Sequence, residues 1–351
     1  MDLDSPDAYA GVDPADALGD VEGTARQWAE AAAVARPALV LDRCDTIVIC
    51  GMGGSGITGD IVWALSLGSF DLPVLVHKGY GVPGFTGPRT LVIALSHSGE
   101  TEETLSAFAA AGERGATRLA VTAGGTLAQR ADADGATLVR VPQGAGRPPR
   151  HSLGTMLVPT LTAVGLDDGL DEAIEVLGGL AAELGRDVPT ARNPAKRLAL
   201  KLATGVVPLA WGGHGIGSVA AYRLKCQLSE NAKVTAIHGE LPEANHNDVV
   251  GWEGSSPLAG AAAMIGMRDP TGEHPWVARR FELTQDLLGE RLVWVQDITA
   301  RGTTPLARVA SLLFQADMVS LYTALATGTD PTPIASIDRL KNGLSEAVVA
   351  S

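Results

Sequence analysis

Residues 46–59 read TIVICGMGGSGITG, an apolar run followed at once by a glycine-rich turn. The run Thr46–Cys50 predicts a buried strand, and the turn leads into a helix expected over Gly59–Leu67. Glycine lets the backbone approach a ligand closely, and a helix N-terminus offers free N–H groups to an anion. A dinucleotide turn would need an acidic residue after the next strand, where His77 and Lys78 stand. The stretch therefore predicts an anion-binding turn or a plain strand-to-helix turn.

Similar strand and helix patterns extend outward from this turn. Further strands are expected at Pro73–His77, Thr90–Leu95, Arg118–Thr122 and Thr137–Val141, with a helix over Glu102–Arg114. In the second half we expect strands at Val206–Trp211 and Leu292–Asp297, a glycine-rich turn at Gly212–Gly217, and helices over Ser218–Ser229 and Leu306–Thr327. Strands that alternate with helices predict an α/β fold, with two αβα sandwich subdomains around parallel central sheets (flavodoxin-like, doubly wound).

The pattern also predicts domain boundaries. Residues 1–20 hold six aspartates and no basic residue, so we expect an acidic flexible tail. Residues 21–154 are expected to form the first subdomain and 155–195 a helical connector. Residues 196–351 are then the second subdomain, which repeats the first as a domain duplication.

Composition excludes several classes of protein. The 351 residues carry a net charge of −13, which disfavours nucleic acid as a partner. Three cysteines form no CxxC pair or disulfide framework, and Cys50 is expected in the core. We see no secretory signal and no apolar run of about 20 residues, so no membrane association is expected and a cytoplasmic location is predicted.

A second motif follows the strand Thr90–Leu95. Ser96-His97-Ser98-Gly99-Glu100-Thr101 places three short hydroxyl side chains around one glycine, directly before a helix. Hydroxyl and N–H donors at a helix N-terminus suit a phosphate monoester. A simple N-capping box is the alternative, although it needs one hydroxyl and not three. The chain lacks a Walker lysine here, so the motif does not indicate a nucleoside triphosphate.

The sequence resembles the sugar isomerase (SIS) phosphosugar-binding domain, and within it the bifunctional phosphoglucose/phosphomannose isomerases. The resemblance rests on matches that follow one another in order over nearly the whole chain from about residue 40. They are Gly53-Gly54-Ser55, Ser96-x-Ser98-Gly99-x-Thr101, Thr122–Leu127, Pro149-Arg150 with Gly154, Gln227-Leu228-x-Glu230-Asn231-x-Lys233, Pro242–Trp252 and Asp330–Pro333 leading to Lys341.

The resemblance implies a metal-independent isomerase that needs no cofactor. Its substrates would be glucose 6-phosphate or mannose 6-phosphate, converted to fructose 6-phosphate through a cis-enediol; the sequence does not fix the balance between them. The phosphate would be bound by Gly53, Gly54, Ser55, Ser96, Ser98 and Thr101.

The resemblance also implies four catalytic residues. Glu230 would be the base that moves the C2 proton, and Arg150 would stabilise the enediolate, unless a small shift aligns Arg147 instead. His246 would open the sugar ring from the partner subunit of a homodimer, assisted by Lys341. From composition alone, Glu230 and Lys341 would be ordinary solvated helix residues and His246 an ordinary loop histidine.

Three alternative functions differ in what they require. A non-catalytic phosphosugar sensor would use the same binding motifs, although no effector module such as a helix-turn-helix precedes the first strand. A glutamine-dependent aminotransferase would need an N-terminal cysteine nucleophile. A zinc-dependent isomerase could take His238, Glu240, Glu243 and His246 as ligands, but Gly239 and Pro242 would break a helix that aligned them.

Overall fold

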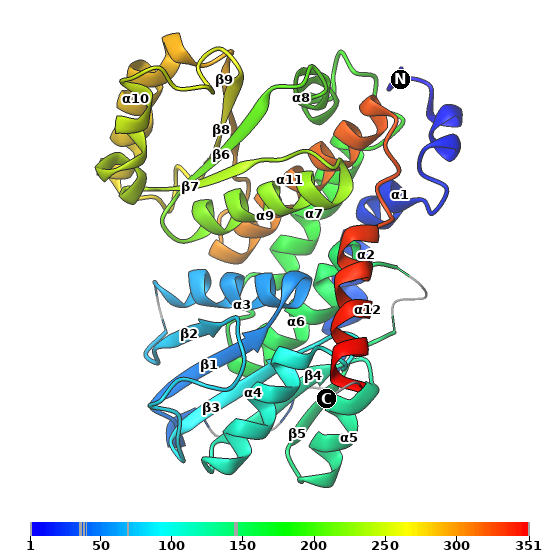
Figure 1. Cartoon of the computed structure of the whole chain (residues 1–351), viewed down its shortest axis with the longest axis vertical. Helices are drawn as coiled ribbons and strands as arrows, with labels where there is room; N and C mark the ends of the chain where they lie inside the picture. Colours follow the sequence, from blue (N-terminus) through cyan, green and yellow to red (C-terminus); the bar gives the residue numbers. More distant parts are fainter. Residues whose placement is uncertain are drawn as a thin grey trace.

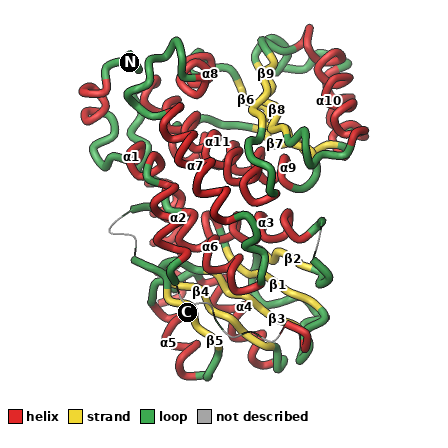
Figure 2. Tube along the Cα trace, turned by 180° about the vertical axis from the view of Figure 1, so that it is seen from behind, coloured by secondary structure: helices red, strands yellow, loops and turns green. Residues whose placement is uncertain are grey.

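The computed structural model describes residues 2–34, 37, 39, 41–68, 70–143 and 147–349. Two parallel sheets lie one above the other along the long axis of the molecule, separated by helices (Figures 1 and 2). The predicted fold class is confirmed: each sheet is covered by helices on both faces, and all strand pairs are parallel.

The first sheet has five strands in the order β2-β1-β3-β4-β5. Their bounds are β1 Thr46–Gly51, β2 Val74–His77, β3 Thr90–Leu95, β4 Thr117–Thr122 and β5 Thr137–Arg140. Every strand predicted for this half is present, with ends that move by one residue or not at all. The central strand β3 is buried along its whole length, as expected for a strand covered on both faces.

Helices α3, Gly53–Ser66, and α6, Leu153–Val164, cover the face of this sheet that points toward the second subdomain. The opposite face is covered by α4, Glu102–Glu113, and α5, Gly125–Ala133. Cys50 lies under α4 and is buried, which confirms its place in the core.

The second sheet has four strands in the order β7-β6-β8-β9. They are β6 Val207–Gly213, β7 Ile237–Leu241, β8 Ala262–Arg268 and β9 Val295–Thr299. Sequence patterns found β6 and began β9 three residues too early, but missed β7 and β8. Helix α10, Pro275–Leu288, also missed, covers one face; α9, Ile216–Asn231, and α11, Pro305–Thr327, cover the other.

The two subdomains share the layer of helices between them. Helix α11 packs against α9, against α7, Leu170–Leu184, and against α8, Pro194–Leu202, while α3 of the first half packs against α9 of the second. Helix α11 is long and apolar enough to cross a bilayer, contrary to the expectation from sequence, but 89% of its most apolar stretch is buried inside the protein. One hydrophobic core therefore runs through both halves.

The expectation of a flexible tail over residues 1–20 is wrong for the residues that the structure describes. This segment forms the 3-10 helix η1, Pro6–Gly11, and helix α1, Ala17–Glu22, and it buries Leu3 and Tyr9. Lys196, fully buried, donates from Nζ to the Leu3 carbonyl over 2.5 Å. A basic residue far along the chain thus binds the acidic segment. The composition of residues 1–20 alone does not reveal this contact.

The expected connector, 155–195, does not coincide with a boundary between packed units. Helix α6 spans the expected limit at 154/155 and packs on the first sheet, and α8 begins at Pro194. Helix α2, Thr24–Ala32, which was assigned to the first subdomain, packs on both α6 and α7. The remaining elements are η2 Leu41–Arg43, η4 Pro149–His151, η5 Glu243–His246, η6 Asp248–Trp252, η7 Gly289–Arg291 and α12 Ala335–Val349.

The contact between α2 and α6 gives a prediction about stability. A Cβ at Gly154 would lie 2.6 Å from Trp28 Nε1, so Gly154→Ala forces the buried indole to move. We expect the free energy of unfolding to fall by about 1–3 kcal/mol in urea denaturation. The control is Gly179→Ala in α7, where nothing lies within 4 Å of the new methyl group. Since alanine favours helix there, this variant should gain up to about 1 kcal/mol, and equal behaviour of the two variants would contradict the packing argument.

Candidate active site

The two glycine- and serine-rich turns meet at the carboxyl edge of the first sheet. β1 and β3 are neighbours in parallel register, with Gly51 opposite Leu95. The first turn follows β1 and begins α3, where Gly53 adopts a positive φ of 53° that favours glycine. The second turn follows β3 and begins α4. The structure therefore brings Gly53–Ser55 and Ser96–Thr101 together at one edge, where open α/β sheets bind ligands.

Hydrogen bonds within the second turn fix its shape. Ser96 is buried, and its hydroxyl lies 2.9 Å from Thr101 Oγ1 and accepts from the Gly99 amide over 3.1 Å. Ser98 is exposed, and its hydroxyl accepts from the Glu100 amide over 3.2 Å. The motif thus combines a buried hydroxyl at Ser96, which holds the turn in shape, with a solvent-exposed hydroxyl at Ser98.

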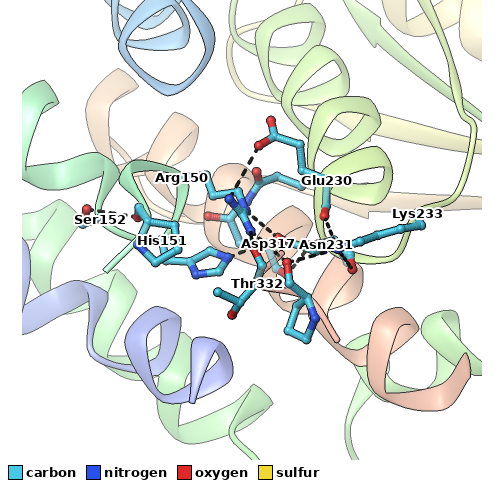
Figure 3. A network of polar contacts seen from close by, with 12 residues as sticks. Arg150, His151, Ser152, Glu230, Asn231, Lys233, Asp317 and Thr332 are labelled. Carbon is cyan, nitrogen blue, oxygen red and sulfur yellow. Dashed lines mark hydrogen bonds and ion pairs between the residues drawn. The ribbon is translucent and has the colours of Figure 1, made fainter. Parts of the chain in front are cut away.

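Arg150 lies beside the first turn, in the 3-10 helix η4, and it is only 6% exposed. A Cβ added at Gly54 would lie 3.6 Å from the Arg150 amide nitrogen, so the turn and this arginine are in contact range. Its guanidinium donates from Nε to Asn231 Oδ1 over 2.9 Å, and from Nη2 to the carbonyls of Pro331 and Thr332 over 2.8 and 2.7 Å (Figure 3). These bonds fix the plane of the guanidinium.

The remaining terminal nitrogen of Arg150, Nη1, faces a carboxylate. Glu230 Oε2 lies 3.8 Å from Nη1, and the Glu230 side chain is 29% exposed (Figure 3). Glu230 belongs to the last turn of α9, so it reaches the site from the second subdomain. A partly exposed carboxylate beside a fixed cation is thus placed next to the glycine-rich turn of the first subdomain.

Lys233 holds the end of α9 and the segment that follows α11. It adopts a positive φ of 56°, and its Nζ donates to the carbonyls of Glu230 and Asp330 over 2.8 and 2.9 Å. A cation at a helix C-terminus satisfies carbonyls that have no partner inside the helix. Lys233 thereby joins the helix that carries Glu230 to the segment whose carbonyls hold Arg150.

A second buried ion pair lies behind Arg150. Arg223 of α9 donates from Nε and Nη2 to the two carboxylate oxygens of Asp317 in α11, over 2.8 and 2.6 Å. Arg223 Nη2 also donates to the Arg150 carbonyl over 2.9 Å, and Gln227 Nε2 donates to Asp317 over 3.0 Å. This pair links the main chain of η4 to both central helices.

Desolvation dominates the electrostatics of this region. Burial lowers the pKa of the Arg150 guanidinium, which the Glu230 carboxylate partly offsets, and arginine stays charged throughout. Burial, together with the Arg150 charge, also lowers the pKa of the neighbouring His151 to about 4. Burial and Arg150 likewise lower the pKa of Lys233. His151 is therefore neutral near pH 7.

His246 lies elsewhere in the chain. Helix α9 connects β6 to the parallel neighbour β7, so it runs from the carboxyl edge of the second sheet back to the amino edge. Glu230, at the end of α9, is at the amino edge, whereas His246 in η5 directly follows β7 at the carboxyl edge and is exposed. Within one chain these two residues do not share a site.

Lys341 lies on α12, whose residues 335–341 are all exposed. The helix leaves the segment that holds Arg150 and ends at the level of the first sheet (Figure 1). Of the other candidates, Arg147 forms an ion pair with Asp20 over 3.1 Å, so it is Arg150 that stands beside Glu230.

Of the suggested zinc ligands, His238 and Glu240 lie near one another, since both contact the Ser218 hydroxyl. His238 contacts Ser218, and Glu240 accepts from Ser218 and pairs with His214 over 2.6 Å. Within the described part of the chain, no three His, Cys, Asp or Glu side chains are arranged to hold a metal ion.

Comparison of the sequence with known proteins identifies a family. Residues 40–146 match the SIS domain, and residues 191–344 match the bacterial phospho-glucose isomerase C-terminal SIS domain. A bifunctional phosphoglucose/phosphomannose isomerase from Caldicellulosiruptor bescii is 39% identical over 86% of this chain and 90% of its own. The chain belongs to the bifunctional phosphoglucose/phosphomannose isomerase family.

A second relative agrees with this membership, and a solved structure agrees with the fold. The relative of the same name from Aquifex aeolicus is 36% identical over 86% of this chain and 90% of its own. The crystal structure of a glucose-6-phosphate isomerase like protein from Thermus thermophilus has a TM-score of 0.66 and 20% identity, over 97% of this chain and 99% of that one. At this identity the second comparison shows the fold.

Several residues of the site in this family member were not found from the sequence. Asn231 and Lys233 were part of a matched motif but received no role, and His151, Arg223 and Asp317 were not singled out. A positive φ at Lys233 or a buried ion pair 94 residues apart in sequence leaves no local pattern. The adjacency of Asn231 to Glu230 was the one available signal.

The hydrogen bonds of the Arg150 guanidinium give a prediction that can be tested without an activity assay. Arg150→Lys keeps the positive charge but removes the planar guanidinium. Its N–H groups donate to Asn231 Oδ1 and to two backbone carbonyls, so buried acceptors are left unpaired in the variant. We expect the free energy of unfolding to fall by about 2–4 kcal/mol. The matched control, Arg147→Lys, keeps a part-exposed ion pair with Asp20 and should change by less than about 1 kcal/mol. Similar losses in both variants would contradict the role assigned to the guanidinium.

Proposed function

We propose that this chain interconverts glucose 6-phosphate and mannose 6-phosphate with fructose 6-phosphate. Membership of the family supports the class of reaction, an isomerisation of hexose phosphates. The observation that carries it to this chain is the pair Arg150 and Glu230, 3.8 Å apart, beside a turn of Gly53–Ser55 suited to a phosphate. A base, a fixed cation and an anion-binding turn are the three parts that this isomerisation needs.

The phosphate of the substrate would be bound by the two turns of the first subdomain. Gly53, Gly54 and Ser55 open α3, and Ser98 with Thr101 precedes α4, so two helix N-termini face the same edge of the sheet. The buried Ser96 would act mainly by keeping the second turn in shape, as its bonds to Gly99 and Thr101 indicate. This arrangement holds one end of the sugar and directs the other toward α9.

Glu230 would move the proton. As a carboxylate it takes the proton from C2 of the aldose and returns it to C1, while the electron pair shifts through a cis-enediol. Negative charge develops on the substrate oxygens in this step. The Arg150 guanidinium, fixed by Asn231 and two carbonyls, stabilises that charge without having to reorient. Its placement opposite Glu230 allows both groups to reach the C1–C2 unit.

His246 of the partner subunit would open the sugar ring, with help from Lys341. The ring oxygen needs a proton and O1 must lose one, which an imidazole can do near pH 7. The separation of His246 from Glu230 across the second sheet supports a site completed by a second copy of the chain. On α12, next to Lys341, Ile337, Leu340 and Leu344 share one face and are 38%, 69% and 54% exposed, which supports a homodimer interface there.

We also propose that the protein is cytoplasmic, because this location fits a hexose 6-phosphate substrate. The net negative charge disfavours a nucleic-acid partner on physical grounds, because it repels phosphate backbones.

Glu230→Gln tests the identity of the base. The amide keeps the shape of the side chain but cannot accept the C2 proton, so kcat should fall by about 10²- to 10⁴-fold while KM changes little. Formation of fructose 6-phosphate from each aldose, with a chelator present, is the measurement. The control is Glu282→Gln on the exposed face of α10, which should retain full activity. If Glu230→Gln kept more than a few per cent of the activity, the base would be another residue.

Mixing two inactive variants tests the shared site. Glu230→Gln and His246→Ala should each be inactive alone. In a mixed dimer, one of the two sites then combines a native Glu230 with a native His246 of the partner. After full subunit exchange, about a quarter of all sites should be native, and activity should recover to that level. Exchange is verified by native mass spectrometry with one isotopically labelled chain. Verified exchange without recovery would show that His246 does not act across an interface.

A further inference from the structure

One amide oxygen connects the catalytic pair to a buried histidine. Asn231 Oδ1 lies 2.9 Å from Arg150 Nε and 3.1 Å from His151 Nε2, and Asn231 is itself fully buried (Figure 3). The Asn231 Nδ2 group donates to Ser320 Oγ in α11 over 2.9 Å. Asn231 follows Glu230 directly at the end of α9. A change in the orientation of this amide would therefore alter the hydrogen bond that orients Arg150.

The chemistry of the three groups determines where the protons are. Arginine has only N–H donors, so the Asn231 atom that faces Arg150 Nε must be the oxygen. His151 Nε2 lies at hydrogen-bond distance from the same oxygen and must therefore carry a proton. Since burial, together with the Arg150 charge, keeps the imidazole neutral at pH 7, its other nitrogen, Nδ1, is a bare acceptor.

The environment of Nδ1 agrees with this tautomer. His151 Nδ1 is buried and has no hydrogen-bond partner within the described part of the protein, and the same is true of Trp28 Nε1, which can only donate. Both residues line one small cavity of about 20 Å³. That volume suits a single water, which could accept from the Trp28 indole and donate to His151 Nδ1. Such a bridge would leave Nε2 as the protonated nitrogen.

We propose that His151 is a positioning residue, which holds Asn231 and through it the Arg150 guanidinium in the orientation that faces Glu230. This role rests on the proposed function. Asn231 Oδ1 has two acceptor sites, and the His151 N–H fills the one that Arg150 leaves. Without His151 the amide keeps only Ser320 and Arg150 as partners, so the orientation of Asn231, and with it that of the Arg150 guanidinium, is less tightly constrained. His151 itself does not contact the substrate.

The tautomer is tested by nitrogen NMR on protein labelled with ¹⁵N-histidine. We expect His151 to show a protonated, pyrrole-type Nε2 and a pyridine-type Nδ1 that does not titrate between pH 8 and pH 5. The resonances are assigned by their loss in His151→Gln, with His274→Gln as the control for another histidine, at the N-cap of α10. A protonated Nδ1, or an imidazolium at pH 7, would overturn the proposal.

Kinetics test the positioning role with two variants of matched size. His151→Leu fills the space but removes the donor, so kcat should fall by about threefold to tenfold with KM changed by less than about twofold. His151→Gln places an amide N–H close to the position of Nε2 and should recover most of kcat. Thermal unfolding of both variants verifies that they fold.

The outcomes separate this proposal from the function on which it rests. Full kcat in folded His151→Leu would overturn the positioning role alone, and so would equal losses of kcat in the Leu and Gln variants. A wild-type enzyme that converts neither hexose 6-phosphate would overturn the proposed function, and the positioning role with it, even if the NMR spectra showed the expected tautomer. Loss in His151→Leu with recovery in His151→Gln would support the proposal.

Discussion

The buried guanidinium of Arg150 connects three parts of the chain that meet at the site. It lies in the short helix after the first sheet, is oriented by Asn231 of the second subdomain, and donates to two carbonyls after α11. A charge with an exposure of 6% is stable only when its donors are satisfied, because desolvation of an unpaired cation costs several kcal/mol. The requirement to satisfy this one group therefore constrains how the two halves meet.

The rest of the site follows from that meeting. Helix α9 must end at Arg150, so Glu230 in its last turn faces the guanidinium, and Lys233 ties the same helix end to the segment that supplies the carbonyls. The bidentate pair of Arg223 and Asp317 holds α9 and α11 together behind the site. Polar groups in a low-dielectric interior bind strongly when all are satisfied. A rigid cation is what a developing oxyanion requires.

The way in which the two halves meet also has a consequence for assembly. Helices α3 and α9 pack against each other between the sheets, and the end of α9, at the amino edge of the second sheet, lies next to the carboxyl edge of the first. The loop after β7, which carries His246, is therefore remote from Glu230 of its own chain. If His246 takes part in the reaction, geometry requires a second copy of the chain. The acidic N-terminal segment is anchored by Lys196 and Arg186, whereas α12 exposes the apolar side chains of Ile337, Leu340 and Leu344.

Local sequence determined the strands of the first subdomain almost completely, because they are continuous apolar runs, and its turns carry glycines and hydroxyls at fixed places, but it began the first helix at Gly59, six residues after the observed start of α3 at Gly53. It also determined the two glycine- and serine-rich turns and, through resemblance, pointed to Glu230, Arg150, His246 and Lys341.

Local sequence failed at β7 and β8: Ile237–Leu241 is a half-polar edge strand, and Ala262–Arg268 contains a glycine and begins in an Ala/Gly-rich stretch. It failed again at the acidic N-terminus, whose partners Arg186 and Lys196 lie 170 and 193 residues further along the chain. The placement of Arg150, and not Arg147, beside Glu230, the contacts of His151 and the separation of His246 from Glu230 were decided only by tertiary structure. Each depends on which groups share a buried space, and burial and hydrogen bonding across distant segments leave no trace in the spacing of residues along the chain.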